Sequence, residues 1–465
     1  MVMKQRLVVI GNGMAGMKAV EEILAIDPER FEITVFGAEP HGNYNRIMLS
    51  PVLSGEKTID EIMINDRQWY TDNNITLHAG ADKTVVEINR AQRRVLTADG
   101  THADYDRLLI ATGSNPFILP VPGNDLDGVL AFRDIHDVER MLGYSDSHQH
   151  AIVLGGGLLG LEAANGLTER GMQVTVIHSH EVLLNRQLDV EAGKLLQAEL
   201  ESRGVHFKMP ARTETLIGDD TGHIKSVRFA DGSELPCDLF VMAIGVRPNI
   251  TLAESSGLYC ERGIVVSDTM QSYDPSVYAV GECVQHRGDT FGLVAPLFDQ
   301  AKVCAKQICG LGVPGYKTLP TATKLKVTGI KLFSVGNFLG DAECDFLLFR
   351  DLKQGVYKKL VLKNNRIIGA VLFGETSEGA WYQELIEQAT DITAMRSLLI
   401  FGQAYAKPLA ALNKEPLAGV NKEPLAVHIE KPLAVLNKEP SAVVNEKPLA
   451  IPNKKPLAEQ KTQAA

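Results

Sequence analysis

The chain has 465 residues, of which 45% are hydrophobic and 22% are charged. This composition excludes disorder along most of the length and predicts a globular protein. At roughly 100–200 residues per domain, the length predicts about two to four domains. The formal net charge of −10 argues against a nucleic-acid or anionic-membrane surface.

Cysteine usage and apolar runs bear on metal content and location. The 6 cysteines form no Cys-x-x-Cys pair, so we expect no bound metal in this chain and a reducing, cytoplasmic environment. Residues 7–10 are apolar, but glycine interrupts them at once, which predicts a strand and a turn instead of a signal peptide. No uninterrupted apolar run reaches about 18 residues, and we therefore expect no membrane span.

Two segments of the chain repeat one pattern of hydrophobicity. In each, a short apolar run is followed by a glycine-rich turn, a helical segment and a second apolar run. The apolar runs are residues 7–10 and 31–36 in the first segment, and 151–154 and 173–177 in the second. Two such strand–turn–helix–strand units predict two Rossmann-like, doubly wound α/β domains.

The first glycine turn, residues 11–16, reads G-N-G-M-A-G. In a G-x-G-x-x-G turn between a strand and a helix, the glycines permit a sharp turn and bring backbone N–H groups against a pyrophosphate. The acidic residue expected on the adenosine ribose follows the second strand, and Glu39 is the candidate, slightly late in the sequence. The candidate contacts within the turn are Gly11, Gly13, Met14, Ala15 and Gly16.

The second glycine turn, residues 155–160, reads G-G-G-L-L-G and predicts a second dinucleotide site. His178 follows the next strand, where an NADH enzyme usually places an acid, and no arginine stands there to receive a 2′-phosphate. His178 therefore leaves NADH and NADPH both open, and as a loop residue it is expected to be solvated. The candidate contacts near the turn are Gly155, Gly157, Leu158, Leu159, Gly160 and Glu162.

Three further predicted strands end in short motifs. One of them, residues 277–280, leads to Gly281 and Glu282. The other two, residues 108–110 and 239–242, each end in a glycine where we expect the chain to cross between the two domains. The residues of these two crossing motifs are Ala111, Thr112, Gly113 and Gly245.

The C-terminal part of the chain changes character. Strands are predicted at residues 346–349, 357–362 and 367–373, with the last two joined as a hairpin across Asn364-Asn365, and a helix follows at residues 379–389. From residue 403 the sequence is low-complexity, with a proline at every eighth position from Pro408 to Pro456. We expect this tail to be disordered, and its role, either an expanded repeat or a docking arm, stays open.

In order and spacing, these motifs resemble those of two-dinucleotide flavoprotein reductases, the pyridine nucleotide-disulfide oxidoreductase superfamily. Finer features are the sequence N-Y-N-R at residues 43–46, the pair Leu49-Ser50 and the sequence R-Q-L-D that ends at Asp189. With these features, residues 5 to about 402 resemble the N-terminal flavin module of assimilatory NAD(P)H nitrite reductase large subunits. They also resemble the electron-transfer subunits of assimilatory nitrate reductases.

The resemblance implies a division of the chain and a set of cofactor contacts. It implies an FAD domain (residues 1–114 and 241–317), an inserted NAD(P) domain (115–240), a small α+β domain (318–402) and the tail (403–465). FAD would bind at the first glycine turn, and NADH or NADPH would bind at the second, near Gly245 and His178. The further FAD contacts that it implies are Glu39, Arg46, Ser50, Ala111, Thr112, Gly113, Gly281, Ala295 and Glu282, the last on the ribityl chain.

The implied activity is electron transfer from NADH or NADPH through FAD to an iron–sulfur partner. The partner would be an iron–sulfur or sirohaem subunit of a nitrite or nitrate reductase, or a small iron–sulfur carrier. Residues 40–60 contain no cysteine, so no thiol is placed there to relay electrons and a dithiol reductase is not expected. Two alternatives stay open, a rubredoxin or ferredoxin reductase and a non-catalytic, flavin-bound interaction protein. The oligomeric state also stays open.

Overall fold

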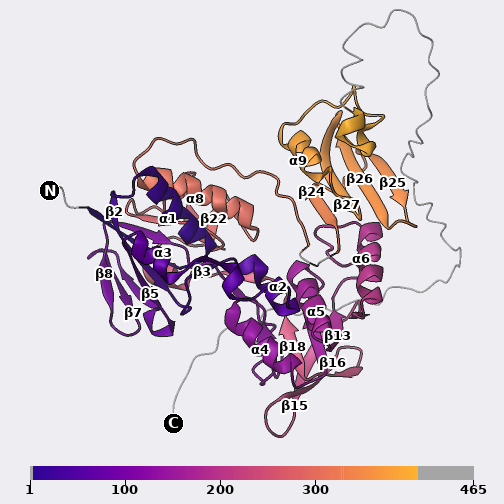
Figure 1. Cartoon of the computed structure of the whole chain (residues 1–465), viewed down its shortest axis with the longest axis horizontal. Helices are drawn as coiled ribbons and strands as arrows, with labels where there is room; N and C mark the ends of the chain where they lie inside the picture. Colours follow the sequence, from indigo (N-terminus) through magenta and orange to yellow (C-terminus); the bar gives the residue numbers. More distant parts are fainter. Residues whose placement is uncertain (1–3, 326, 328, 407–465) are drawn as a thin grey trace, which may run out of the picture. The chain divides into compact units, whose positions relative to one another are not determined.

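In the computed structural model, which describes residues 4–325, 327 and 329–406, a five-stranded parallel sheet carries the first glycine turn. We call it the first sheet, and its order is β21-β9-β1-β2-β5. Helices α1 (Met14–Ile26) and α8 (Val294–Ile308) lie side by side against it (Figure 1). The strands are β1 (Gln5–Ile10), β2 (Phe31–Gly37), β5 (Ile75–Ala79), β9 (Arg107–Ile110) and β21 (Val277–Ala279).

The second sheet repeats this plan around the second glycine turn. It is also parallel, in the order β11-β18-β12-β13-β14, and helices α4 (Ile135–Ser145), α5 (Leu158–Glu169) and α6 (Val190–Ser202) accompany it. The predicted class, α/β with two Rossmann-like sheets, is confirmed. The strands are β11 (Val129–Ala131), β12 (His150–Leu154), β13 (Gln173–Ile177), β14 (His206–Lys208) and β18 (Leu239–Met242).

Burial explains why the apolar runs of both sheets are continuous. The four residues Leu7–Ile10 are all buried in β1, and Ala151 through Leu154 are all buried in β12. Parallel strands covered on both faces select unbroken apolar runs instead of an alternating pattern. The chain passes between the sheets twice, and the two passages pair as an antiparallel ribbon of β10 (Ser114–Pro116) and β19 (Val246–Pro248).

Smaller elements complete the part of the chain that surrounds the two sheets. Four small antiparallel or mixed sheets are present: β3 (Asn43–Tyr44) with β4 (Met63–Asn65); β6 (Val85–Asn89), β7 (Arg94–Thr97) and β8 (His102–Asp104); β15 (Thr213–Gly218), β16 (Ile224–Phe229) and β17 (Glu234–Pro236); β20 (Ile264–Val266), β22 (Val284–His286) and β23 (Asp289–Thr290). The short helices are α2 (Leu49–Ser54), α3 (Arg67–Asp72), α7 (Thr251–Ser255), η1 (Arg46–Met48), η2 (Asp60–Ile62) and η3 (Ala81–Lys83).

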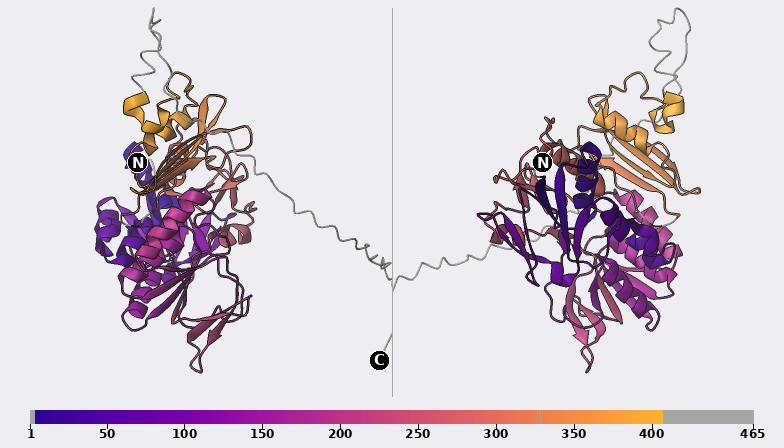
Figure 2. Two further views of the ribbon diagram at one scale, coloured as in Figure 1. Left: turned by 90° about the vertical axis from the view of Figure 1, so that its right-hand side faces the viewer. Right: turned by 60° about the vertical axis from the view of Figure 1, so that its left-hand side comes forward.

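The C-terminal described part forms a four-stranded antiparallel sheet, the small sheet, in the order β24-β27-β26-β25. Asn364 and Asn365 both have positive φ, 51° and 56°, as the predicted two-residue hairpin requires. Helix α9 (Gly379–Glu387) lies on one face of this sheet (Figure 2). The other elements are β24 (Leu332–Gly336), β25 (Asp345–Asp351), β26 (Val356–Lys363), β27 (Arg366–Phe373) and η4 (Leu399–Phe401).

One apolar core shows how the second sheet and the small sheet are joined. The core of the second sheet includes Tyr357, Val371 and Phe373 of the small sheet, so the two sheets share one set of buried side chains.

All 6 cysteines lie within the described residues and are free thiols. Cys283 and Cys304 are buried core residues, and burial raises the pKa of both thiols.

Among the described helices, none has both the length and the apolar character needed to cross a membrane. The predicted domain limits at residues 114, 240 and 317 stay predictions. The tail predicted from residue 403 lies, beyond Ala406, outside the described residues.

Candidate functional site

The first glycine turn packs tightly against the crossing motif that follows β9. Gly11 has φ +111°, and a Cβ at this position would lie 2.1 Å from the carbonyl oxygen of Ala111. A Cβ at Gly16 would lie 2.8 Å from the carbonyl oxygen of Gly11. At Gly13, by contrast, a Cβ would meet no atom of the described residues within 4 Å. The outer glycines therefore fix the turn, while the central glycine faces open space.

The second glycine turn repeats this division of roles. Gly155 has φ +128°, and a Cβ there would lie 2.4 Å from the carbonyl oxygen of Ala243. A Cβ at Gly160 would lie 1.9 Å from the carbonyl oxygen of Gly155, whereas one at Gly157 would meet no described atom within 4 Å. The turns follow β1 and β12, the central strands of their sheets. In an α/β sheet, ligands bind at the carboxyl ends of the strands, at the point where the strand order reverses.

The helices that follow the turns begin without a side-chain cap. Asp134 and Asp189 cap α4 and α6 by accepting backbone hydrogen bonds of 2.9 and 3.1 Å. Helices α1 and α5 begin after Gly13 and Gly157, and within the described residues neither has a capping side chain or an acidic first turn. Their first N–H groups and positive dipole ends suit an anion such as a pyrophosphate.

Helix α8 begins in the same uncapped way, with Leu293 at its N-cap and no acidic residue in its first turn. The helix begins at Val294, so Ala295, an implied FAD contact, and Pro296 lie inside its first turn. Proline is tolerated there because the first N–H groups of a helix have no partner within the helix.

Backbone groups of the predicted FAD contacts are held by neighbouring segments. The Thr112 hydroxyl donates to the carbonyl oxygen of Asn249 at 2.7 Å, and the Asn249 N–H donates to the carbonyl oxygen of Gly113 at 2.9 Å. The Gly281 N–H donates to Oε1 of the fully buried Gln300 on α8 at 3.0 Å. The two crossing points are thus fixed to each other, and the Gly281 motif is fixed to α8.

Glu282 accepts two strong hydrogen bonds from residues that the sequence did not identify. Nη2 of Arg133 donates to Glu282 Oε2 at 2.6 Å, and the Ser114 hydroxyl donates to the same oxygen at 2.7 Å. Arg133 follows β11 of the second sheet and is 149 residues from Glu282 in the sequence. No local motif marks this pair, because only the fold brings the two side chains together.

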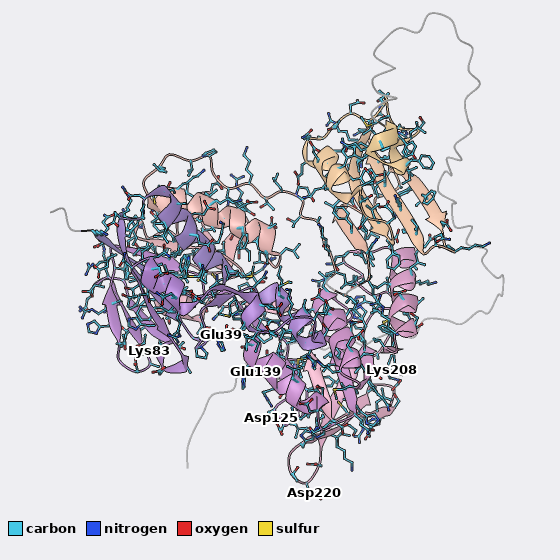
Figure 3. All side chains as sticks on the ribbon, viewed as in Figure 1. Glu39, Lys83, Asp125, Glu139, Lys208 and Asp220 are labelled. Atoms are coloured by element: carbon cyan, nitrogen blue, oxygen red, sulfur yellow. The ribbon has the colours of Figure 1, made fainter. Side chains whose placement is uncertain are left out.

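Glu39 and Arg46, both predicted FAD contacts, form an ion pair. Nη2 of Arg46 donates to Glu39 Oε1 at 2.5 Å, and the Tyr44 hydroxyl donates to Glu39 Oε2 at 2.7 Å. The other guanidinium nitrogen, Nη1, donates to the carbonyl oxygen of Arg133 at 2.7 Å. Glu39, which Figure 3 labels, is therefore held in place by two donors, and its role on a ribose stays a prediction.

Ser50 and Glu162 connect the candidate residues of the two glycine turns. The Ser50 hydroxyl on α2 donates to Glu162 Oε2 on α5 at 2.6 Å. Both side chains are buried, with 4% and 8% of their surface exposed. A hydrogen bond to a carboxylate in such a buried position is stronger than one in water, so it fixes α2 against α5.

The expectation that His178 is solvated is wrong. The backbone N–H of Gly156 donates to Nδ1 of His178 at 3.2 Å, and the ring lies against the second glycine turn. Nδ1 therefore needs a free lone pair, which places the proton of the neutral ring on Nε2. Burial, reinforced by the neighbouring His180, lowers the pKa of His178 below its ordinary value of 6.5.

Protonation of His178 is expected to weaken nucleotide binding at the second turn. Because the folded-state pKa is lowered, the contribution of the neutral ring is present above pH 6.5 and is lost as the pH falls through the folded pKa. Loss of one hydrogen bond of about 1 kcal/mol corresponds to an about fivefold weaker complex. An NMR titration of the His178 imidazole, together with nucleotide titrations over the same pH range, checks this prediction. A His178 midpoint at or above pH 6.5 would contradict it.

Comparison with known proteins agrees with this geometry. Residues 5–307 match the family described as pyridine nucleotide-disulphide oxidoreductase, and residues 321–390 match the rubredoxin NAD+ reductase C-terminal domain. The chain is 49% identical over 397 residues to a nitrite reductase [NAD(P)H] of Bacillus subtilis, covering 85% of this chain and 49% of that protein. It is 43% identical to the assimilatory nitrate reductase electron transfer subunit of the same organism, covering 85% of this chain and 51% of that one.

The chain thus spans about half the length of these curated relatives. Among solved structures, the covalent putidaredoxin reductase–putidaredoxin complex is similar, with a TM-score of 0.78 and 25% identity. That similarity covers 88% of this chain and 99% of the other. The predicted resemblance to two-dinucleotide reductases and to the nitrite and nitrate reductase proteins is confirmed.

Proposed function

Because the chain belongs to the pyridine nucleotide-disulphide oxidoreductase family, we propose that it is an FAD-dependent NAD(P)H oxidoreductase that passes electrons to an iron–sulfur partner of nitrite or nitrate assimilation. The observation that carries the proposal is the pair of glycine turns. Each has a central glycine facing open space and an uncapped helix behind it. A single such turn would indicate one nucleotide, whereas two equivalent ones indicate a donor and an acceptor nucleotide in one chain.

FAD fits the first glycine turn, where Gly13 leaves room for a pyrophosphate and the N-terminus of α1 offers N–H groups to it. The uncapped N-terminus of α8, with Ala295 in its first turn, would favour negative charge on the flavin ring. A bound flavin would supply the step from a two-electron donor to a one-electron acceptor. Glu282, held by Arg133 and Ser114, would orient the ribityl chain.

NADH or NADPH fits the second glycine turn, where Gly157 is open and α5 is uncapped. The Ser50–Glu162 hydrogen bond would keep this helix at a fixed distance from α2, and so from the flavin side of the site. His178 offers no carboxylate to the adenosine ribose, so anaerobic titration with each nucleotide decides between NADH and NADPH.

The electron acceptor is proposed to be an iron–sulfur or sirohaem subunit of a nitrite or nitrate reductase, or a small iron–sulfur carrier. One relative is an assimilatory nitrate reductase electron transfer subunit, which supports a separate acceptor, as does the similarity to a reductase in complex with putidaredoxin. Residues 40–60 hold no cysteine, so electrons would leave without a thiol relay. A cytoplasmic location is part of this proposal.

A second candidate function is rubredoxin or ferredoxin reduction, which the match of residues 321–390 to the rubredoxin reductase C-terminal domain favours. Turnover measured with rubredoxin against turnover with a [2Fe–2S] nitrate reductase subunit separates the two. Faster turnover with rubredoxin would make rubredoxin the proposed electron acceptor and would leave the proposed reductase activity unchanged.

One experiment tests the proposed activity most directly. The purified protein is titrated anaerobically with NADH and, separately, with NADPH, and the flavin absorption band is followed. We expect bleaching by at least one of them at about one equivalent per flavin, since a nicotinamide donates two electrons. A yellow protein that neither nucleotide bleaches would instead support a non-catalytic, flavin-bound interaction protein.

A further inference from the structure

We propose that Tyr357 and Lys359, on the small sheet, are positioning residues for the second glycine turn. The inference rests on the proposed function, because it assumes that NADH or NADPH binds at that turn. Neither residue is near the turn in sequence, and both act through Asp189.

Asp189 joins the small sheet to the second sheet. Its Oδ1 accepts the Ala192 N–H at 3.1 Å and so caps helix α6. Its Oδ2 accepts the Tyr357 hydroxyl at 2.7 Å and lies 3.2 Å from Nζ of Lys359. The ion pair is largely withdrawn from water, with side chains 14% and 12% exposed for Asp189 and Lys359. Removing one partner of such a pair leaves an uncompensated charge, so the arrangement holds only when it is complete.

Burial, together with the hydrogen bond to Asp189, raises the pKa of Tyr357, so its hydroxyl keeps the proton that it donates. Tyr357 is also part of the apolar core that contains Leu183, Leu184 and Leu188. These three leucines belong to the loop of residues 178–188, which runs from β13 to Asp189. The small sheet therefore shares one apolar core with this loop and is bonded to Asp189, the residue that directly follows the loop.

The same loop holds the second glycine turn at its other end. The Leu184 N–H donates to the carbonyl oxygen of Gly156 at 2.9 Å, and the Gly156 N–H donates to Nδ1 of His178 at 3.2 Å. Both backbone polar groups of Gly156 are thus occupied by the loop. A Cβ at Gly156 would lie 2.8 Å from His178 and from Leu183, which shows how closely the loop covers the turn.

These contacts form one continuous path from the small sheet to the nucleotide. Tyr357 and Lys359 fix Asp189, Asp189 fixes the end of the loop, and the loop fixes Gly156 between Gly155 and Gly157. Loosening the first contact would let the loop depart from the turn, which would weaken nucleotide binding without touching the nucleotide.

The chain supplies a matched control one residue away. Lys358 is also on β26 and also largely buried, with 8% of its surface exposed, but it pairs with Glu375 at the end of the small sheet. Lys358→Met therefore removes an equivalent charge without touching the path to Asp189.

The test compares the parent protein with Tyr357→Phe, Lys359→Met, Lys359→Arg and the control Lys358→Met. We expect Tyr357→Phe and Lys359→Met to raise KM for the reducing nucleotide about fivefold with little change in kcat, since the path acts on binding. Lys359→Arg should restore most of the affinity. Lys358→Met should leave KM unchanged.

A second readout does not depend on activity. Arg186 is exposed in the loop, so the rate of tryptic cleavage after this residue reports loop order. We expect faster cleavage in Tyr357→Phe and Lys359→Met than in the parent and in Lys358→Met. Equal cleavage rates and equal KM values in all variants would overturn the inference. Should neither NADH nor NADPH bleach the flavin of the parent protein, the proposed function would fail instead, so the two failures are distinguishable.

Discussion

Gly157→Asp is expected to abolish reduction of the flavin by NADH and NADPH while the flavin stays bound. Gly157 is the N-cap of α5 with φ −86°, and a Cβ there meets no described atom within 4 Å, so the backbone accepts the substitution. A carboxylate at this N-terminus would occupy the anion site itself and repel the pyrophosphate. Juxtaposed like charges cost several kcal/mol, which corresponds to an about 100-fold or greater loss of affinity.

Gly13→Asp provides the mirror image of this substitution. Gly13 occupies the same place at the N-terminus of α1, with φ −88° and equally open surroundings among the described residues. We expect this variant to purify with little flavin, whereas Gly157→Asp purifies yellow. The flavin absorption per protein and the anaerobic bleaching rate measure the two effects. Rapid bleaching of Gly157→Asp by NADH would contradict the assignment of the second turn to the nicotinamide.

The two sheets and their turns could be predicted from sequence because their signals are local. Each turn combines an unbroken apolar run, three glycines at fixed spacing and a helical segment within about 20 residues. The structure explains the spacing: Gly11 and Gly155 have positive φ, and Gly160 packs directly against the preceding turn. The hairpin at Asn364-Asn365 was predictable for the same reason, since asparagine tolerates the left-handed conformation.

Contacts between distant parts of the chain could not be predicted. The partners of Glu282, Arg133 and Ser114, lie 149 and 168 residues away, and Ser50 and Glu162 are separated by 112 residues. Their residue types are common on any protein surface, so only the fold distinguishes them. His178 was misread because its loop position suggested solvent, while the close approach of Gly156 depends on packing that the sequence does not encode locally.

Gly160→Ala is expected to destabilise the second sheet strongly, although it adds a single methyl group. Its Cβ would lie 1.9 Å from the carbonyl oxygen of Gly155 and 3.0 Å from the carbonyl carbon. Both are backbone atoms of the turn that joins β12 to α5, so no side-chain rotation can relieve the overlap. Helix α5 would have to move away from its strand, and overpacking of this kind costs about 3 kcal/mol.

Gly157→Ala is the matched control, because it makes the same chemical change 3 residues earlier in open surroundings. Alanine is a poorer N-cap than glycine, so we expect it to cost less than about 1 kcal/mol. Urea unfolding followed by circular dichroism compares the two variants through the shift of the midpoint at constant slope. If both midpoints shifted equally, the close approach of α5 to the turn could not be what requires glycine at position 160, and the repeated G-x-G-x-x-G pattern would owe its last glycine to the ligand alone.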